Sequence, residues 1–344
     1  MSFERGWNAL HLSMPEKIPH TQYISHDEFT LNKTGINTRE PEQQFLAWPA
    51  LARALDFDFI WNTCEMPVQG RMTRLGHAEW SNTDEMDTVT DCPFVAIDDV
   101  LTFDPVREYG IHDLESTVEY FTKHLNDQKQ RYPEAVVSGG RYNTLFSACI
   151  RTFGWEMFLS SVPHNEEKFN KILEGFFELS MAEVRAWLKT DLSVYLCHDD
   201  IAWTSGAVFH PDWYRKYIFP KYKRLWKPLK DRGIIVLYCA DGNFTEFVDD
   251  IAEAGADGFI FEPLTSLEYI VNNYGKSKII IGNADCRILQ FGTRESIKKE
   301  LYRCIDAGKS CAGYFMAVGN HIPNGIPFEN IDYFFELFEK QRNR

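Results

Sequence analysis

The sequence contains no hydrophobic run of the roughly 18–20 residues that a helix needs to cross a bilayer, which excludes a membrane-spanning protein. Its first residues, MSFERGWNALHLSMPEK, do not combine a basic start with an apolar core. We therefore expect no signal peptide, no membrane association and a cytoplasmic location.

Basic residues are in deficit. Lys and Arg total 36 against 50 Asp and Glu, which gives a formal net charge of −14. Nucleic acids and anionic membranes are bound by clustered Lys and Arg, so neither is expected as a partner. Close cysteine pairs are also missing: no two of the eight cysteines are spaced as CxxC. They are interpreted as buried thiols and not as disulfides or a paired-cysteine metal site.

No internal repeat, low-complexity tract or Pro/Gly/Ser linker divides the 344 residues. We therefore expect a single domain over residues 1–344. Barrels of eight strands often exceed 250 residues when their loops are elaborated. The hydrophobic share of 44% and the charged share of 25% are typical of a globular domain.

The most regular feature of the chain is a series of short apolar runs that alternate with segments of helical periodicity. Runs apolar on both faces are typical of parallel strands buried between a core and a helix layer. An open doubly wound sheet would show the same alternation, but eight runs and the lack of a Gly-rich phosphate loop favour a closed (β/α)8 TIM barrel. The expected strands are 18–24, 56–63, 135–142, 192–200, 234–242, 256–263, 278–286 and 312–321; the expected helices are 41–55, 114–132, 165–190, 211–233, 245–255 and 293–308, with short helices after Glu262.

Residues 1–110 are less regular and form the N-terminal elaborations of the expected barrel. Residues 64–110 contain turns, a predicted small hairpin and many polar groups. A segment of this length beside a barrel mouth is usually functional. We therefore interpret it as a lid or pocket wall, in which His77 is a candidate substrate contact.

Polar residues follow the apolar runs at the point where each strand ends. In a (β/α)8 barrel the carboxyl ends of the strands meet at one mouth, where the chemistry occurs. Carboxylates crowded there raise one another's pKa or bind a cation. The residues concerned are His198, Asp199 and Asp200; Cys239 and Asp241; Glu262; Asn283 and Asp285; and Asn320 and His321.

Each of these residues also has an ordinary structural role to weigh. Asp199 and Asp285 are equally suited to cap helix N-termini. Cys239 is interpreted first as a small buried residue, and His198 as a packing residue at the barrel rim. Tyr142 and Trp203 are candidates to stack on an aromatic substrate.

Three segments resemble the uroporphyrinogen decarboxylase-like superfamily: HDDIAWTSGAVFHPDWYRKYIFPKYKRL (198–225), GNADCRILQFGT (282–293) and GNHIPNGIPFENI (319–331). The superfamily contains porphyrinogen decarboxylases and methyltransferases that exchange methyl groups with corrinoid proteins. The resemblance implies a single (β/α)8 barrel, and the members often form homodimers.

Two departures from the superfamily patterns narrow the expected activity. The decarboxylases clamp carboxylates with paired arginines near the N-terminus, whereas Arg5, Arg39 and Arg53 are isolated here. The zinc-dependent thiol methyltransferases use a His-x-Cys pair and a late Cys, whereas Leu237 and Asn320 occupy the first and last of those places. Both activities are therefore disfavoured.

The remaining resemblance is to the branch that demethylates methoxylated compounds, chiefly aryl methyl ethers, with the corrinoid (cobalamin) of a partner protein as acceptor. Asp285, Glu300 and His321 reproduce the acid–acid–His spacing linked to a metal in that branch. The resemblance thus implies a corrinoid-binding partner protein, a small methoxylated substrate and possibly zinc.

We assign expected roles on this basis. The leaving oxygen needs an acid or a Lewis-acidic metal. The catalytic candidates are Asp241, Glu262, Asp285 and His321; Asp241, Glu262 and His321 are expected to bind zinc or donate the proton; the substrate contacts are Asp199, Asp200, His198, Tyr142, Trp203, His77 and Asn283. The alternatives are a cofactor-independent decarboxylase of a small acid or porphyrinogen, and a non-catalytic corrinoid-binding module.

Overall fold

A computed structural model describes residues 1–73 and 92–344 of the chain, and its central element is a ring of parallel strands. The first barrel strand runs through residues 18–25 and ends in β1 (Ile24–Ser25). The others are β2 (Phe59–Ile60), β3 (Val136–Val137) with β4 (Gly139–Arg141), β5 (Val194–His198), β8 (Ile235–Ala240), β9 (Gly258–Phe261), β10 (Ile279–Ile281) and β11 (Tyr314–Phe315). They match the eight predicted runs.

The pairings close the ring. β4, β5, β8, β9, β10 and β11 form a six-stranded parallel sheet in that order, and β2 pairs in parallel with β3. On the remaining side His20 bridges to Met316, and the Asp58 N–H donates to the His20 carbonyl at 2.8 Å. β12 (Ile322–Pro323) extends this seam by pairing with β1. The predicted (β/α)8 barrel is thus confirmed.

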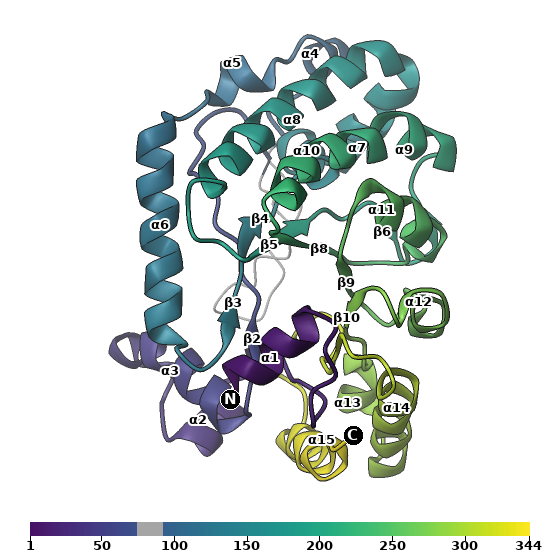
Figure 1. The fold of residues 1–344 in the computed structure, drawn as a ribbon. Helices are drawn as coiled ribbons and strands as arrows, with labels where there is room; N and C mark the ends of the chain where they lie inside the picture. Colours follow the sequence, from purple (N-terminus) through teal and green to yellow (C-terminus); the bar gives the residue numbers. More distant parts are fainter. Residues whose placement is uncertain (74–91) are drawn as a thin grey trace.

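Helices surround the strands on the outside (Figure 1). The predicted helix 211–233 is broken at Ile218, because Pro220 lacks an N–H and restricts the backbone before it. The helices are α1 (Phe3–Leu10), α2 (Asp27–Thr34), α3 (Pro41–Ala54), α4 (Ile97–Leu101), α5 (Pro105–Tyr109), α6 (Leu114–Arg131), α7 (Phe146–His164), α8 (Glu166–Trp187), α9 (Pro211–Tyr217), α10 (Phe219–Asp231), η1 (Thr245–Phe247) with α11 (Val248–Ala254), α12 (Leu267–Tyr274), α13 (Cys286–Phe291), α14 (Arg294–Gly308) and α15 (Phe328–Gln341).

The irregular N-terminal region contains short helices where it is described. Residues 92–110 hold α4 and α5, and α5 packs against α8. The antiparallel hairpin of β6 (Ala202–Trp203) and β7 (Gly206–Ala207) lies later in the chain, after β5. The part of the predicted small hairpin that falls on residues 74–91 lies outside the described residues. In residues 1–73 and 92–344, no helix is both long enough and apolar enough to span a membrane.

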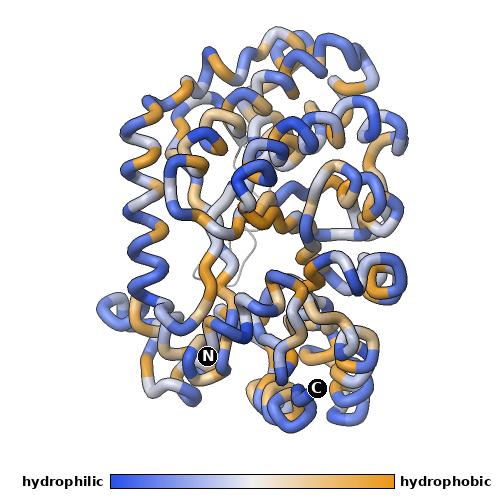
Figure 2. The backbone as a smooth tube through the Cα atoms, in the orientation of Figure 1, coloured by the Kyte–Doolittle hydropathy of each residue, from blue (hydrophilic) through white to orange (hydrophobic). Residues whose placement is uncertain are grey.

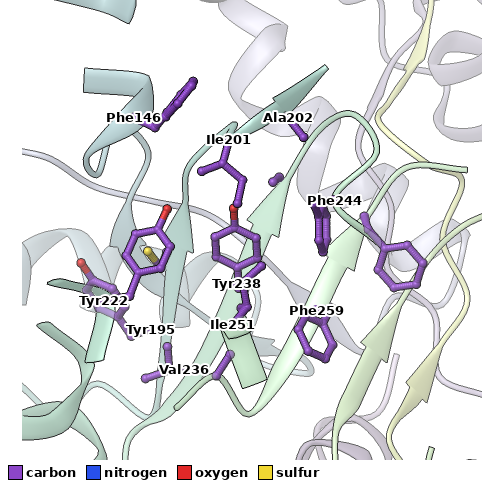
Figure 3. Packing of buried hydrophobic residues seen from close by; sticks show 14 of the residues in the cluster. Phe146, Tyr195, Ile201, Ala202, Tyr222, Val236, Tyr238, Phe244, Ile251 and Phe259 are labelled. Carbon is purple, nitrogen blue, oxygen red and sulfur yellow. The ribbon is translucent and has the colours of Figure 1, made fainter. Parts of the chain in front are cut away.

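Alternating side chains divide each strand between two cores. Val194 and Leu196 of β5 point into the barrel, while Tyr195 and Cys197 pack against the helices. The tube in Figure 2 is orange along the strands and mostly blue on the outer helices. Figure 3 shows part of the outer core, where Tyr195 and Tyr238 lie near Tyr222 of α10, and Phe259 lies farther along the sheet. The same alternation sets the direction of each residue that ends a strand.

Helix α1 covers the amino-terminal end of the barrel. Ala9 and Leu10 join the inner core. Arg5 forms an ion pair with Asp58 at 2.7 Å, and Arg342 near the C-terminus pairs with the same carboxylate at 3.2 Å. These contacts tie both ends of the chain to one end of the barrel, and the polar strand ends lie at the other end.

Candidate active site

Three carboxylates and a histidine from neighbouring strands converge at the carboxyl end of the barrel. His198 ends β5, Asp200 follows it, Asp241 follows β8 and Glu262 follows β9. Ligand atoms of His198, Asp200 and Asp241 all lie within 4.8 Å of one another. Glu262 is near enough to act on the charge of Asp241. We call these four residues the acidic cluster.

Within the acidic cluster, the surroundings of Asp241 favour the protonated form of its carboxyl. Its burial raises the pKa of the Asp241 carboxyl well above the usual value, and the negative charges of Asp200 and Glu262 raise it further. A carboxyl whose pKa is raised in this way is suited to act as a general acid.

The neighbouring carboxylates are held by N–H donors. The Asp241 backbone N–H donates to Asp200 at 2.8 Å, and the Gly242 N–H donates to Glu262 at 2.8 Å. The Asn320 amide donates to Glu262 at 2.9 Å and reaches Asp241 at 3.5 Å. Gly242 has φ of 78°, and a Cβ there would lie 2.5 Å from the Ala202 carbonyl oxygen, so this turn requires glycine.

The cluster borders a small pocket of about 20 Å³ at the barrel mouth. Asp241, Glu262 and Asn320 supply its polar side, and its apolar side comes from strand residues and Trp61. Among the described residues, those that line this pocket include no Arg or Lys. The pocket therefore suits an uncharged group with an oxygen atom better than a carboxylate.

His198 and Tyr142 form a stacked pair beside the cluster. Their rings lie 4.0 Å apart with an interplanar angle of 5°. His198 Nδ1 contacts the Tyr142 carbonyl oxygen at 3.0 Å, which requires the proton on Nδ1. His198 Nε2 lies 3.4 Å from the Asp200 carboxylate. A proton or a cation between these two atoms would join them.

Glu65 holds the turn that presents Tyr142. One Glu65 oxygen accepts the Tyr142 and Asn143 N–H groups at 2.9 and 2.6 Å. Arg141 and Arg151 each lie 3.8 Å from the Glu65 carboxylate, and Arg141 also pairs with Glu183 at 2.5 Å. Sequence analysis missed Glu65, although its position two residues after the second predicted strand was a usable signal.

Asp199 does not reach the pocket, contrary to its predicted role as a substrate contact. It is fully buried and accepts the N–H groups of Leu145, Phe146 and Ser147 at the start of α7. The Tyr222 hydroxyl donates to it at 2.6 Å. Strand alternation turns this residue outward, so it caps a helix, which was its alternative role.

Asp285 is the N-cap of α13, which was its alternative role. It accepts the Arg287 N–H at 2.9 Å and pairs with the Arg287 guanidinium at 2.7 Å. Although burial opposes it, hydrogen bonding to Arg287 lowers the pKa of this carboxyl. Glu300 accepts the Asp285 N–H and pairs with Arg303, so the acid–acid–His spacing does not form one metal site.

The remaining predicted substrate contacts are Asn283, Trp203 and His77. Asn283 is 1% exposed, and its amide donates to the Glu262 and Thr265 carbonyl oxygens, so it does not face a substrate. Trp203 is exposed in the β6–β7 hairpin with its ring 5.2 Å from that of Trp155. His77 lies outside the described residues.

His321 lies at the edge of the cluster. Its Nδ1 contacts the Asn320 side-chain oxygen at 3.1 Å, and its ring meets Tyr23 edge-on at 5.7 Å. Burial lowers the pKa of His321, so it is neutral near pH 7. Asn320, at φ of 64°, places its own amide between His321 and Glu262, so the predicted trio of Asp241, Glu262 and His321 does not gather.

Within residues 1–73 and 92–344, one group of three suits a metal ion: His198, Asp200 and Asp241. An imidazole nitrogen and two carboxylates are ligands that zinc accepts. The hydrogen bond from Nδ1 to the Tyr142 carbonyl would orient His198 as a ligand through Nε2. The donor set fits zinc, with two ligands different from those predicted.

Comparison with known proteins decides the family. The family described as uroporphyrinogen decarboxylase (URO-D) matches residues 87–341, which is most of the chain. The chain belongs to this family. It is 25% identical to the uroporphyrinogen decarboxylase of Thermus thermophilus over 246 residues, or 69% of this chain and 70% of that protein. It is 24% identical to that of Syntrophotalea carbinolica over 174 residues, or 51% of this chain and 49% of that protein.

Among solved structures, the uroporphyrinogen decarboxylase family member described here is similar to a methyltransferase from Methanosarcina mazei. The TM-score is 0.67 with 15% identity, and 99% of each chain is covered. At this identity the likeness shows a shared fold. The predicted superfamily and barrel are confirmed, and the reaction has to be argued from the site.

Proposed function

We propose that this protein demethylates a small methoxylated compound, in particular an aryl methyl ether, and passes the methyl group to the Co(I) corrinoid of a partner protein. The observation that carries the proposal is the position of the Asp241 carboxyl in a pocket at the barrel mouth, where burial and the charges of Asp200 and Glu262 raise its pKa. Ether cleavage requires such an acid, because an alkoxide or phenoxide is a poor leaving group.

The reaction balances with one proton from the protein. The reduced corrinoid supplies the nucleophile that accepts the methyl group. The C–O bond breaks, its electron pair stays on oxygen, and the Asp241 proton passes to that oxygen to give an alcohol or phenol. The negative charges of Asp200 and Glu262 then act on the new Asp241 carboxylate, which favours its reprotonation.

Residues around Asp241 position the substrate in this proposal. The Tyr142 ring, stacked on His198 and 37% exposed, offers a face for the aromatic ring. Burial raises the pKa of the Tyr142 hydroxyl, and the nearby Asp200 raises it further, so it stays protonated as a donor. His321 lies at the rim, where it orients Asn320.

Zinc is a second form of the same proposal. His198, Asp200 and Asp241 would hold the ion, which would supply a Lewis acid for the ether oxygen. Asp241 would then be a ligand and not the proton donor. Metal analysis of the purified protein, with His198→Ala as the comparison, separates the two forms: stoichiometric zinc that is lost in the variant favours the ion.

The names of the relatives favour decarboxylation as a rival function. A carboxylate-rich substrate needs cationic partners, because an unpaired buried carboxylate costs several kcal/mol. The described lining of the pocket offers Asp241 and Glu262 instead, and this charge argues against the rival.

The test is to mix the protein with cob(I)alamin and a panel of methoxyaromatic compounds and to follow the cobalt spectrum. Formation of methyl-cobalt with loss of the ether supports the proposal. Release of carbon dioxide from an acid or a porphyrinogen, without any change at cobalt, would replace it with the decarboxylase.

A homodimer is expected from the resemblance, and the sedimentation coefficient measures it.

A further inference from the structure

A second cavity lies over β2 on the outside of the barrel, between α3 and α6 (Figure 1). Its volume is about 200 Å³. An apolar cavity of about 150 Å³ is enough to bind benzene, so this one has room for a single ring with a small substituent. We call it the outer cavity.

Aromatic side chains form one wall of the outer cavity. Tyr23 and Trp48 pack with their rings 4.9 Å apart, and Phe45 is 61% exposed beside them. Exposed aromatic rings that surround a hollow usually mark a binding site. A planar aromatic ligand would stack there and cover Phe45.

The opposite wall is polar. Asn62 lines it and accepts a hydrogen bond from His124 at 2.8 Å. The Asn62 amide nitrogen itself is closed off from the cavity, so it offers no donor to a ligand.

A positive charge lies at the same wall. Arg131 lines the cavity, and no ion pair among the described residues includes its guanidinium. The acids nearest to it in sequence are engaged elsewhere, since Asp127 pairs with Lys123 and Glu134 pairs with Arg53. A carboxylate on the ligand would pair with the Arg131 guanidinium.

We propose that the outer cavity binds a small aromatic carboxylate, with its ring against Tyr23 and Trp48 and its carboxylate toward Arg131. The acidic cluster would repel such a ligand, so the two sites select different chemistry. Trp61 lines both the outer cavity and the pocket of the acidic cluster. The proposal does not depend on the methyl-transfer reaction.

Calorimetric titration of the full chain tests this assignment with three probes: benzoate, benzamide and cyclohexanecarboxylate. Benzoate is expected to bind saturably, and loss of either its charge or its aromatic ring should weaken binding. Arg131→Gln should weaken benzoate about twofold to fivefold, the range of a partly exposed ion pair, and should leave benzamide unchanged. Arg131 is exposed, so the variant is expected to fold, which thermal unfolding verifies.

Arg53→Gln is the matched control, because Arg53 is a neighbouring exposed arginine that does not line the outer cavity. It should leave benzoate binding unchanged. The assignment is overturned if benzoate produces no saturable heat, if both arginine variants weaken it equally, or if Asp241→Asn alters it more than Arg131→Gln. None of these outcomes bears on the cobalt assay.

Discussion

At the scale of single residues, strand alternation explains which acids meet. Asp199 and Asp200 are adjacent in sequence, yet one is buried behind the barrel wall and the other faces the mouth. Asp241 gains its raised pKa from this convergence, and no local sequence pattern around it would have shown that. A substitution of Asp241 measures how this raised pKa affects the free energy of unfolding.

Asp241→Asn should stabilise the protein at pH 8 and abolish its activity. The pKa of Asp241 is higher in the folded protein than in the unfolded chain, where it is about 4. Its contribution to the free energy of unfolding is therefore full below the unfolded pKa and is lost as the pH rises through the folded pKa. Asn removes that loss, so urea unfolding should show a gain of about 1–3 kcal/mol at pH 8 and a smaller one at pH 5. Glu253→Gln, on the exposed face of α11, is the control. A destabilised variant at pH 8 would argue that Asp241 is ionised and paired.

Glu65→Gln should lower kcat more than it changes KM, because Glu65 positions Tyr142 through two backbone N–H groups. A loss of one such contact in the transition state corresponds to about tenfold in rate. Glu183→Gln is the matched control, since Glu183 pairs with Arg141 and accepts the Met66 N–H, whereas Glu65 accepts the N–H groups of the Tyr142 turn. Equal effects of both variants would assign the role to the Arg141 network instead.

At the scale of elements, the strands could be predicted because their apolar runs are buried on both faces. The capping of α7 could not, since its N-terminal amides are bound by Asp199 from β5's end and not by a residue beside them in sequence. Long-range contacts of this kind leave no local pattern. The position of His321 was missed because of a local feature, the left-handed backbone at Asn320, which a non-glycine residue rarely adopts.

Tyr222→Phe should destabilise the protein by about 1–3 kcal/mol, the value of a hydrogen bond to a charged group. Its hydroxyl joins α10 to Asp199, and thereby to the start of α7. Tyr217→Phe, which removes a longer bond from α9 to the more exposed Glu166, is the comparison and should cost less. Chemical denaturation measures both. If the two losses are equal, the Asp199 bonds contribute no special stability.

At the scale of the whole molecule, one end of the barrel is closed by structural contacts and the other carries the candidate active site. Buried Arg–Asp pairs and α1 cover one end, and the acidic cluster occupies the other. The barrel, its strand order and the polar mouth followed from the sequence. The group of His198, Asp200 and Asp241 did not, because its convergence depends on the register of two neighbouring strands.

Because the Arg342–Asp58 ion pair and the acidic cluster lie at opposite ends of the barrel, a substitution at one end should not alter the chemistry at the other. Arg342→Gln should lower the free energy of unfolding by several kcal/mol, since it leaves Asp58 with a fully buried charge that is less well paired. It should leave the pH dependence of methyl transfer unchanged, because the mouth lies at the opposite end. Assays of the folded variant at several pH values check this, and a shifted profile would show that the two ends are coupled.

The central claim is that the Asp241 carboxyl is protonated at neutral pH. Infrared difference spectroscopy between the wild-type protein and Asp241→Asn at pH 7 measures this state directly. We predict a carbonyl stretch of a protonated carboxyl group in the wild type that is missing in the variant. A difference spectrum that contains only carboxylate bands would contradict the account.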